Sequence, residues 1–425
     1  MNYVEIEKCR VCGNKDLTQV IHFEPQFLSP TFVKSNVNNP LADIKVPLTV
    51  LVCDQSNNPD GCGLVQLKET TDHELLYKDY FYRSATNETM RRDLKNVVDT
   101  VLSKVATNAG DVVVDIASND GTMISFFPTN LKRLGVEPAS NITWDHLDPS
   151  ITVVNDYFSK AALEPKLNGE KVKIFTCCAM FYDLDNPNSF VADVKSLLAS
   201  DGVWCIQLSN LLSMLKNMNF YDICHEHLEY YSLETLNTVM ERNGLTIYDA
   251  ELNAVNGGSA RVFITHKDTA PEKTEAFKAL LAEEQTFDLK SPKTLVAFDE
   301  KIKQLAETVR SYLQNEIAGG NHVIGLGAST KGNVLLQLFG IDKTMLPYIS
   351  EISKDKIGLR TLGTDIELIS DEQANSMNPS TKLVLPWYFK DEIVKREKPY
   401  LDQGGKLLFP MPYAHIVSKD GEVNL

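Results

Sequence analysis

Val112-Val-Val-Asp-Ile-Ala-Ser-Asn-Asp-Gly121, followed by Thr-Met-Ile-Ser-Phe-Phe127, is the stretch of this chain that decides its fold. Its β-branched residues predict a buried strand, its polar residues a tight turn, and the apolar residues after the turn the start of a helix. A second short strand ends at Gly135-Val-Glu-Pro138. An acid placed there, at Glu137, is typical of the first half of a nucleotide-binding sheet, where it binds ribose hydroxyls.

The turn differs from the dinucleotide fingerprint G-x-G-x-x-G, because Ala117 and Asn119 stand where glycines are expected. Side chains at these positions obstruct a pyrophosphate, whereas a cofactor without phosphates tolerates them. We therefore expect S-adenosylmethionine; the alternative is an ordinary βα unit that binds no ligand. The expected cofactor-binding residues are Asp115, Ser118, Asn119, Asp120, Gly121, Glu137, Pro138 and Asp156.

Length and composition indicate a multidomain enzyme. The chain has 425 residues and a net charge of −15, and 43% of its residues are hydrophobic. This charge argues against sequence-independent binding of nucleic acid, which needs a cationic surface. No apolar run approaches ~20 residues, so no membrane span is expected, and the N-terminus does not resemble a secretory signal. We expect a cytoplasmic enzyme, monomeric or dimeric, that acts on a small molecule.

The pattern of the chain predicts four regions. Residues 1–68 read as a small loop-rich module, and residues 69–270 alternate helix and strand patterns. Residues 271–320 are charged and nearly free of Gly and Pro, which indicates one or two connecting helices. A second α/β unit occupies residues 321–425. The expected fold class is therefore α/β, with a doubly wound sheet, an N-terminal metal module and a C-terminal Rossmann-like domain.

The N-terminal cysteines have the spacing of a metal site. Cys9 and Cys12 form a standard knuckle, and Cys53 and Cys62 supply a second, looser pair. Thiolates arranged as a tetrahedron suit structural zinc. Disulfides are less compatible with a large chain that lacks an export signal. Unliganded thiols in a loop are the alternative.

The segment Tyr221-Asp-Ile-Cys-His-Glu-His-Leu-Glu-Tyr-Tyr231 predicts acid–base chemistry. Histidine takes a proton readily near neutral pH, and a neighbouring carboxylate can orient its ring. In an extended segment, His225 and His227 would share one face and Glu226 would point away. The alternatives are histidines buried for structural reasons and a metal site, although the HExxH pattern is missing.

Two further segments indicate contact with an anionic substrate. Asn256-Gly257-Gly-Ser-Ala-Arg261 offers glycines for close backbone approach and an arginine for bidentate bonds to a phosphate. Its alternative is a tight turn with a surface arginine. Gly325-Leu-Gly-Ala-Ser-Thr-Lys-Gly332 predicts an anion site at a helix N-terminus, with Lys331 assisting.

Together these motifs resemble the S-adenosylmethionine-dependent sugar C-methyltransferases of deoxysugar biosynthesis, a family of nucleotide-deoxysugar 3-C-methyltransferases. The resemblance covers nearly the whole chain in the family's motif order. The matching segments are Cys9 and Cys12 with Cys53 and Cys62-Gly-Leu-Val-Gln-Leu67, Tyr80-Phe-Tyr82-Arg-Ser84, Asp115 to Gly121, Ile223-Cys-His-Glu-His227, Asn256-Gly-Gly, Gly325 to Lys331, Trp387 to Ile393, and Gly404 to Pro412.

The resemblance implies a mechanism. In such enzymes a nucleotide-linked 4-keto sugar binds between the central and C-terminal domains, a histidine removes the proton beside the ketone, and the enolate attacks the cofactor methyl. Here His227 matches the base and Glu226 its companion carboxylate. Tyr80 and Tyr82 lie in the segment that contributes a tyrosine to the active site of the family, and the hydroxyl of either one is suited to stabilise the oxyanion. His225 and Cys224 lie in the same segment and complete the candidate catalytic set.

The sequence departs from the family pattern at three places. Cys224 replaces a catalytic tyrosine and is a weaker hydrogen-bond donor, Asn256 replaces a histidine, and Thr361-Leu-Gly-Thr-Asp-Ile-Glu367 replaces Thr-Pro-Gly-x-His-Ile-Pro. These departures keep three alternatives open: a sugar O-methyltransferase, an NAD-dependent nucleotide-sugar oxidoreductase, and a non-catalytic homologue.

Overall fold

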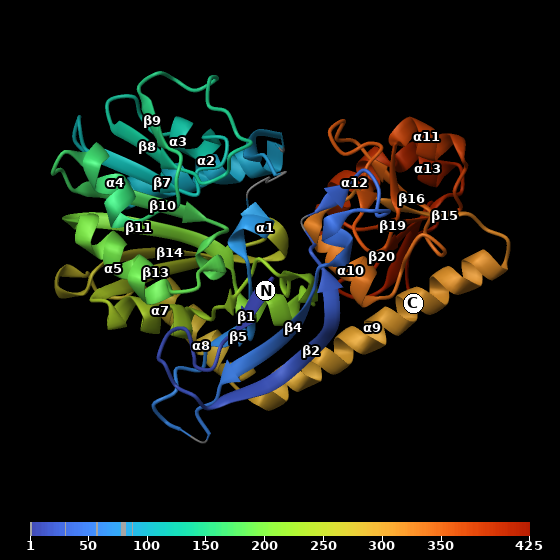
Figure 1. Cartoon of the computed structure of the whole chain (residues 1–425), viewed down its shortest axis with the longest axis horizontal. Coiled ribbons are helices and arrows are strands. Elements are labelled where there is room, and N and C mark those ends of the chain that lie inside the picture. The colour runs from blue at the N-terminus through green and yellow to red at the C-terminus, as the bar shows by residue number, and fades with distance from the viewer. Residues whose placement is uncertain (1, 30, 57, 78–81, 87) are drawn as a thin grey trace.

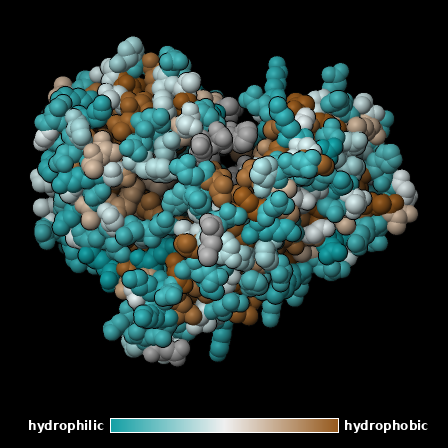
Figure 2. Space-filling view, viewed as in Figure 1, coloured by the Kyte–Doolittle hydropathy of each residue, from teal (hydrophilic) through white to brown (hydrophobic). Residues whose placement is uncertain are grey.

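The computed structural model describes residues 2–29, 31–56, 58–77, 82–86 and 88–425. Figure 1 shows two α/β lobes side by side, with the long strands β2 and β4 below and between them and the helix α9 running beneath both. Figure 2 shows a face of mixed polarity that is notched between the lobes at the top of the view. Among the described residues, no helix combines the length and apolar character needed to cross a bilayer.

The first lobe is built on a doubly wound sheet with strand order β13-β14-β11-β10-β7-β8-β9. Strands β7 to β11 are parallel, and β14 runs antiparallel to both of its neighbours. The strands are β7 (Val112–Ile116), β8 (Lys132–Val136), β9 (Ile151–Val154), β10 (Val172–Cys178), β11 (Leu198–Ser209), β13 (Leu245–Asn253) and β14 (Ser259–His266). Strand order reverses between β7 and β10, so the carboxyl end of β7 is where a ligand is expected in such a sheet.

Helices cover both faces of this sheet (Figure 1). They are α2 (Glu88–Lys104), α3 (Thr122–Ser125), α4 (Lys160–Leu167), α5 (Pro187–Leu197), α6 (Leu211–Lys216) and α7 (Leu233–Arg242), with short 3-10 turns η3 (Phe181–Asp183), η4 (Phe220–Asp222), η5 (Val255–Gly257) and η6 (Lys267–Thr269). The predicted doubly wound sheet is confirmed. Its central strand β7 is buried along its whole length, which explains why an uninterrupted β-branched run encodes it.

The N-terminal module contains longer strands than its sequence predicted. β2 (Leu17–Phe27) pairs with β4 (Lys45–Cys53), and β4 pairs with β5 (Val65–Leu67). β12 (Glu229–Tyr230) from the first lobe completes the sheet β12-β5-β4-β2. Pro25 lies where the β2–β4 register shifts, and a proline cannot donate to a ladder, so this strand did not look continuous. The remaining elements are β1 (Tyr3–Glu5), β6 (Glu69–Thr71), η1 (Pro40–Asp43), α1 (His73–Tyr77) and η2 (Ser84–Thr86).

The second lobe is a mixed sheet with order β22-β21-β20-β19-β15-β16-β18-β17-β3. Its central strands β20-β19-β15-β16-β18 are parallel, and the strands at both edges are antiparallel. Its strands are β15 (Val323–Leu326), β16 (Tyr348–Glu351), β17 (Arg360–Thr361), β18 (Glu367–Ser370), β19 (Thr381–Val384), β20 (Lys406–Phe409), β21 (His415–Ser418) and β22 (Gly421–Asn424). The edge strand β3 (Phe32–Val33) comes from the N-terminal region. Its helical elements are α10 (Thr330–Leu338), α11 (Asp371–Ser376), η7 (Trp387–Phe389), α12 (Lys390–Arg396) and α13 (Lys398–Asp402).

The charged stretch between the lobes forms α8 (Glu275–Phe287) and α9 (Pro292–Ala318), as predicted. α9 packs along β2 and leads into β15, so it connects the lobes while lying against the N-terminal module. Short segments are also exchanged between the parts of the chain. β12 enters the N-terminal sheet, and β3 enters the C-terminal sheet. The lobes and the module are therefore held together by backbone pairing as well as by side chains.

Candidate active site

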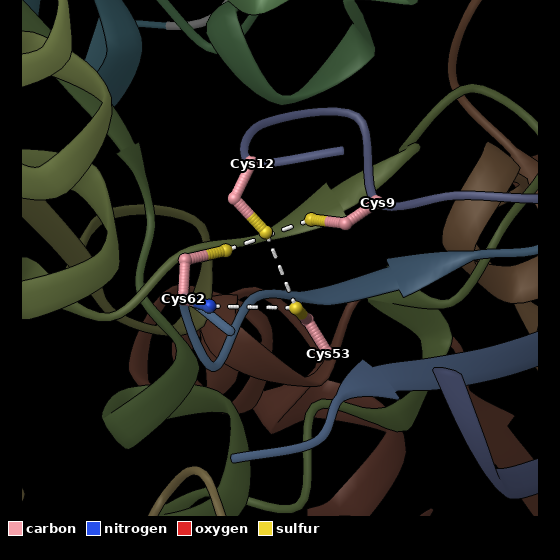
Figure 3. A group of neighbouring side chains, drawn as sticks. All are labelled: Cys9, Cys12, Cys53 and Cys62. Atoms are coloured by element: carbon pink, nitrogen blue, oxygen red, sulfur yellow. Dashed lines mark hydrogen bonds between the residues drawn. The ribbon is translucent and has the colours of Figure 1, made fainter. Parts of the chain in front are cut away.

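The cysteines predicted as metal ligands come together in the N-terminal module (Figure 3). Their sulfur atoms lie within 4.8 Å of one another; Cys9 Sγ is 3.5 Å from Cys62 Sγ, and Cys12 Sγ is 3.4 Å from Cys53 Sγ. A zinc tetrahedron with Zn–S distances of ~2.3 Å has sulfur–sulfur edges of about 3.8 Å, so the cluster has the size that zinc needs. The backbone N–H of Cys62 donates to Cys53 Sγ, which orients this ligand.

Residues 117–121, which we predict to bind the cofactor and call the cofactor loop, keep the backbone of a glycine-rich turn although most of the glycines are missing. Ala117, Asn119 and Gly121 have φ values of 56°, 51° and 79°, all in the left-handed region. At Gly121 a Cβ atom would lie 2.6 Å from a Leu147 methyl group, so glycine is required there. The loop therefore turns at the carboxyl end of β7 as the sequence predicted, with side chains at two positions that glycine usually occupies.

Glu137 lies at the end of β8 beside this loop. Its carboxylate accepts the N–H of Asn119 at 2.8 Å and that of Ala139 at 2.9 Å, and burial raises its pKa. The residue is 6% exposed. These bonds fix the carboxylate and leave acceptor capacity for ribose hydroxyls. Pro138 is half-buried, and Asp156 is exposed beyond the end of β9.

The polar side chains of the loop have partners within the protein. Asp115 is 1% exposed beneath the loop and accepts the Thr176 hydroxyl at 2.8 Å, and burial raises its pKa to about 8. Ser118 is buried, and its hydroxyl occupies the space that a Cβ on Gly135 would fill. Direct contacts of these side chains with the cofactor stay predictions.

Asn119 and Asp120 hold the segment Tyr82–Ala85 against the loop. The Asn119 amide accepts the N–H of Ser84 at 3.0 Å and donates to Tyr82 O at 3.2 Å. Asp120 accepts the N–H of Ala85 at 2.8 Å. Tyr82 is 44% exposed in this segment. Tyr80, the other tyrosine of the predicted oxyanion pair, lies outside the described residues.

His227 is held with one ring nitrogen free. Its Nδ1 lies 2.9 Å from the carbonyl oxygen of Asp222, and because a carbonyl only accepts, Nδ1 carries the proton. The hydrogen bonds of the described residues give Nε2 no partner. The ring centre lies 4.2 Å from that of Tyr182, and burial lowers the pKa of His227 to about 4. At neutral pH the imidazole is therefore uncharged, with Nε2 as a lone-pair acceptor.

The expectation that His225 and His227 share a face is wrong. The segment turns at Cys224, where the N–H of His227 donates to the Cys224 carbonyl at 3.1 Å, so it is not extended. His225 is 1% exposed, and its Nε2 lies 3.2 Å from the carbonyl oxygen of Val46 on β4. His225 therefore binds the N-terminal module. Among the described residues, neither histidine belongs to a group that could hold a metal.

Glu226 and Cys224 are buried next to His227. Burial raises the pKa of Glu226 to about 7, and the nearby Lys331 opposes this shift. Cys224 is 1% exposed, and burial raises the pKa of its thiol well above the ordinary value. A neutral, buried thiol is a weak donor, so Cys224 does not replace a tyrosine hydroxyl.

The C-terminal lobe touches the segment that carries His227. Lys331 on α10 places its Nζ 2.8 Å from Asp222 Oδ1 and 3.3 Å from the Asn256 carbonyl oxygen. The Trp387 indole N–H donates to the Tyr221 hydroxyl. Sequence reasoning gave no role to Asp222, Tyr221 or Trp387. Only their positions in the sequence could have pointed to them. Tyr221 and Asp222 precede the two histidines, and Trp387 begins the segment 387–393 that resembles the family.

The turn at Asn256 lies at this contact, and its substrate role stays a prediction. Asn256, Gly257 and Gly258 have φ values of 56°, 93° and 127°. A Cβ on Gly257 would lie 2.9 Å from the Asn219 amide and 3.1 Å from the Tyr221 hydroxyl. Glycine is therefore needed here because buried side chains pack against the backbone.

Arg261 does not face a substrate, and it is not a surface arginine either. It is 1% exposed, and its guanidinium bonds to protein groups on every side. The partners are Gln207, Asn96, Thr100, Glu251 and Asp93, at 2.9, 2.8, 3.3, 2.8 and 3.2 Å. The phosphate-binding prediction is wrong because α2 brings acidic and amide side chains onto β14, which the local sequence does not reveal.

The C-terminal lobe repeats the loop-and-acid arrangement of the first lobe. Glu351 at the end of β16 accepts the N–H of Ala328 at 3.0 Å and that of Ile352 at 2.8 Å. Glu137 makes the same kind of contact with the cofactor loop. The carboxylate at the end of the second strand thus holds the βα loop in both lobes.

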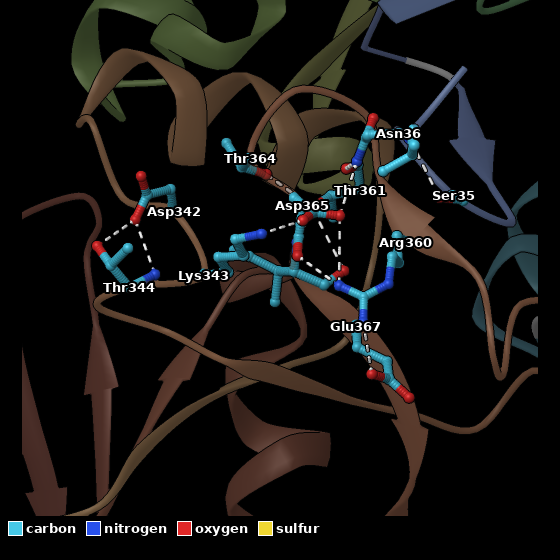
Figure 4. A network of polar contacts seen from close by, with 12 residues as sticks. Ser35, Asn36, Asp342, Lys343, Thr344, Arg360, Thr361, Thr364, Asp365 and Glu367 are labelled. Atoms are coloured by element: carbon cyan, nitrogen blue, oxygen red, sulfur yellow. Dashed lines mark hydrogen bonds and ion pairs between the residues drawn. The ribbon is translucent and has the colours of Figure 1, made fainter. Parts of the chain in front are cut away.

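The departure at Thr361–Glu367 lies in a polar network that joins the N-terminal region to the C-terminal lobe (Figure 4). Asn36 Nδ2 donates to the Thr361 carbonyl at 3.1 Å and to Asp365 Oδ1 at 3.0 Å. Arg360 pairs with Asp365 and Glu367. The acids that replace the family's histidine and proline therefore serve an ion-pair network in the fold.

Comparisons with known proteins agree with this architecture. Three family models match in order: a "Putative zinc binding domain" at residues 9–77, a "Methyltransferase domain" at 87–250 and a "C-methyltransferase C-terminal domain" at 254–412. C-methyltransferase NovU from Streptomyces niveus is 28% identical over 417 residues, which cover 98% of each chain.

Solved methyltransferases resemble part of the chain. An S-adenosylmethionine-dependent methyltransferase from Clostridium acetobutylicum is 13% identical, covers 41% of this chain and 92% of its own, and has a TM-score of 0.33. Magnesium protoporphyrin IX methyltransferase from Synechocystis, also 13% identical, covers 42% and 86% with a TM-score of 0.32. Together the three family models and the relative support a C-methyltransferase family, and the chain is an S-adenosylmethionine-dependent methyltransferase with a structural zinc site.

Proposed function

We propose that this enzyme methylates a carbon beside the ketone of a nucleotide-linked keto sugar, with His227 as the base. The observation that carries the proposal is the fixed tautomer of His227, whose Nε2 is a free acceptor where the two lobes meet. The relative from Streptomyces niveus is a C-methyltransferase, which supports carbon as the acceptor.

S-adenosylmethionine supplies an electrophilic methyl group when it is bound. The residues that would hold it are those of the loop 117–121 with Glu137, which fits ribose hydroxyls because its carboxylate is fixed by two backbone N–H groups. The left-handed loop brings backbone close to the carboxyl end of β7. In this proposal the first lobe binds the cofactor. The C-terminal lobe, with Glu351 beside its βα loop, then binds the nucleoside of the substrate.

His227 takes the proton from the carbon beside the ketone onto Nε2, and the electron pair of that C–H bond forms the enolate. With S-adenosylmethionine held by the loop 117–121 and Glu137, its methyl group would be available to the enolate carbon, and the sulfur would keep the electron pair of the methyl–sulfur bond. Tyr82 is a candidate donor to the enolate oxygen. A pKa of about 4 makes His227 a weak base in the free enzyme; an anionic substrate nearby raises that pKa towards neutrality.

Glu226 is the proposed companion of the base. Glu226 directly precedes His227 in the chain, its carboxyl is buried, and burial raises its pKa to about 7. A group that titrates near neutral pH can exchange a proton with the imidazole after the methyl group has moved. Glu226→Gln is expected to lower kcat while leaving the affinity for S-adenosylmethionine unchanged.

Methyl transfer to a sugar hydroxyl is the second candidate. The buried Cys224 thiol stands where the family has a tyrosine, and a thiol stabilises an enolate poorly. An oxygen acceptor needs only a base, which His227 supplies. Because Cys224 leaves both acceptors open, the test has to detect the C-methylated and the O-methylated product alike.

The test is incubation with S-adenosylmethionine and a panel of nucleotide keto sugars, followed by product mass and NMR. A C-methyl singlet on a quaternary carbon supports the proposal, whereas an O-methyl signal moves the acceptor to oxygen. His227→Gln is expected to lower kcat about 10²- to 10⁴-fold, with S-adenosylmethionine binding retained by calorimetry. Unchanged turnover of that variant would reject the base. Tight binding of NAD without S-adenosylmethionine binding would reject the enzyme class.

A further inference from the structure

Lys331 reaches from the C-terminal lobe into the segment that carries His227. It lies in the first turn of α10, and its side chain is 18% exposed. Its Nζ lies 2.8 Å from Asp222 Oδ1, 4.9 Å from the centre of the Tyr221 ring and 5.7 Å from that of Tyr388. The ammonium therefore sits in a closed set of protein partners, although the sequence predicted it as a substrate ligand.

Asp222 links this ammonium to the base. Its side chain, 2% exposed, pairs with Lys331, while its backbone carbonyl accepts the Nδ1 proton of His227 at 2.9 Å. The carbonyl that fixes the tautomer and the carboxylate that meets Lys331 thus belong to one residue. A shift of Asp222 moves both.

We propose that Lys331 is a positioning residue: its ion pair with Asp222 holds the carbonyl that orients His227, so the base is set only when the C-terminal lobe is docked. The identity of the reaction rests on the proposed function; the orientation of the ring does not. Lys331 also donates to the Asn256 carbonyl at 3.3 Å, which ties the glycine turn to the same contact.

The groups around His227 set the direction of the expected pH effect. Asp222 on η4 raises the pKa of His227, and Lys331 on α10 lowers it. Glu226 lies in the same segment, the Tyr182 ring on η3 contacts the His227 ring at a tilt of 55°, and the Tyr230 hydroxyl on β12 donates to the His227 carbonyl. Loss of the ammonium removes a neighbouring cation and frees the Asp222 carboxylate. Both changes stabilise the imidazolium.

The first experiment titrates His227 by NMR of its ring carbons in the full-length zinc-loaded protein, with His227→Gln identifying the resonance. In Lys331→Met the pKa of His227 is expected to rise by about one pH unit. Lys331→Arg restores the charge and is expected to reverse most of that rise. Lys382→Met is the matched control, because it removes a buried lysine–glutamate pair of 2.6 Å within the C-terminal lobe. An unchanged His227 pKa in Lys331→Met would overturn the proposal.

The second experiment separates positioning from substrate binding. Misplacement of a base by about 1 Å lowers turnover about 10²-fold, so Lys331→Met is expected to lower kcat with little change in KM for the sugar nucleotide. A raised KM with unchanged kcat would make Lys331 a substrate ligand and overturn the proposal. The titration needs no substrate. A shifted His227 pKa in a protein for which no sugar of the panel is turned over would leave positioning standing and reject the proposed substrate.

Discussion

The segment Phe220–Tyr230, which we call the base loop, is held on two sides by different kinds of contact. On the N-terminal side the contacts are largely backbone bonds: Leu67 N–H donates to the Leu228 carbonyl at 2.8 Å, and β12 pairs with β5. Zinc ligand Cys62 lies just before β5. On the C-terminal side, the side chains of Lys331 and Trp387 reach Asp222 and Tyr221.

The two kinds of contact differ in how easily they are broken. A strand pair separates only when its whole ladder is broken, and the zinc site fixes the chain at one end of that ladder. Contacts made by long side chains are lost when one lobe moves by a few ångströms. We therefore expect the N-terminal module to act as a permanent scaffold for the base loop, and the side-chain contacts from the C-terminal lobe to be the first ones lost.

Loss of zinc is expected to have the largest effect on the contacts between the N-terminal module and the base loop. Structural zinc sites contribute on the order of 10 kcal/mol, so Cys62→Ser is expected to unfold the N-terminal module and abolish turnover. Metal analysis and thermal unfolding measure the effect. Cys178→Ala, which removes a thiol outside the cluster, serves as the control. A zinc-free Cys62→Ser protein with normal turnover would show that the scaffold is dispensable.

Arg10 connects the zinc knuckle to the base loop from within the scaffold. It donates to the Leu67 carbonyl, and its Nε lies 3.9 Å from Glu229 Oε1 on β12. Arg10→Met leaves Glu229 buried without its cation, which is expected to lower the free energy of unfolding by about 3 to 5 kcal/mol. Urea denaturation measures this loss, and the double variant Arg10→Met/Glu229→Gln is expected to recover part of it. If the double variant recovered no stability, Arg10 and Glu229 would not interact energetically.

His225 makes the scaffold side sensitive to acid. Burial lowers its pKa to about 4, below the ordinary value of 6.5, so the unfolded chain binds the proton first. The contribution of neutral His225 to the free energy of unfolding is present above pH 6.5 and is lost as the pH falls towards 4. The loss is about 2 kcal/mol between pH 6.5 and 5. His225→Gln keeps an N–H donor for the Val46 carbonyl and cannot titrate. It is expected to flatten this slope in urea titrations, and an unchanged slope would contradict the assignment.

Tyr221→Phe probes the contacts from the C-terminal lobe with the smallest change. It removes the hydroxyl that accepts the Trp387 N–H and keeps the ring beside Lys331. The expected loss of stability is about 1 kcal/mol, accompanied by a lower kcat if lobe contact orients the base. Tyr248→Phe, in the first lobe away from this contact, is the control. A loss of several kcal/mol would mean that this side is as fixed as the scaffold.

Local sequence was sufficient where a feature depends on neighbours along the chain. The β-branched run before Ala117, the helix-forming charged stretch and the Cys9–Cys12 spacing all gave correct predictions. The long strands of the N-terminal module were missed because a proline and a register shift interrupt β2. Arg261 was misjudged because its partners on α2 lie more than a hundred residues away in the chain.

Fold class, the zinc ligands and the turn after β7 follow from the sequence alone, since strand periodicity, knuckle spacing and turn chemistry are local properties. The contacts of the two histidines depend instead on how distant parts of the chain pack. A turn at Cys224 sends His225 to the N-terminal module and His227 to the Asp222 carbonyl. Lys331 reaches Asp222 because two lobes dock. Such roles depend on which distant segments meet, and that is set by packing of the whole chain.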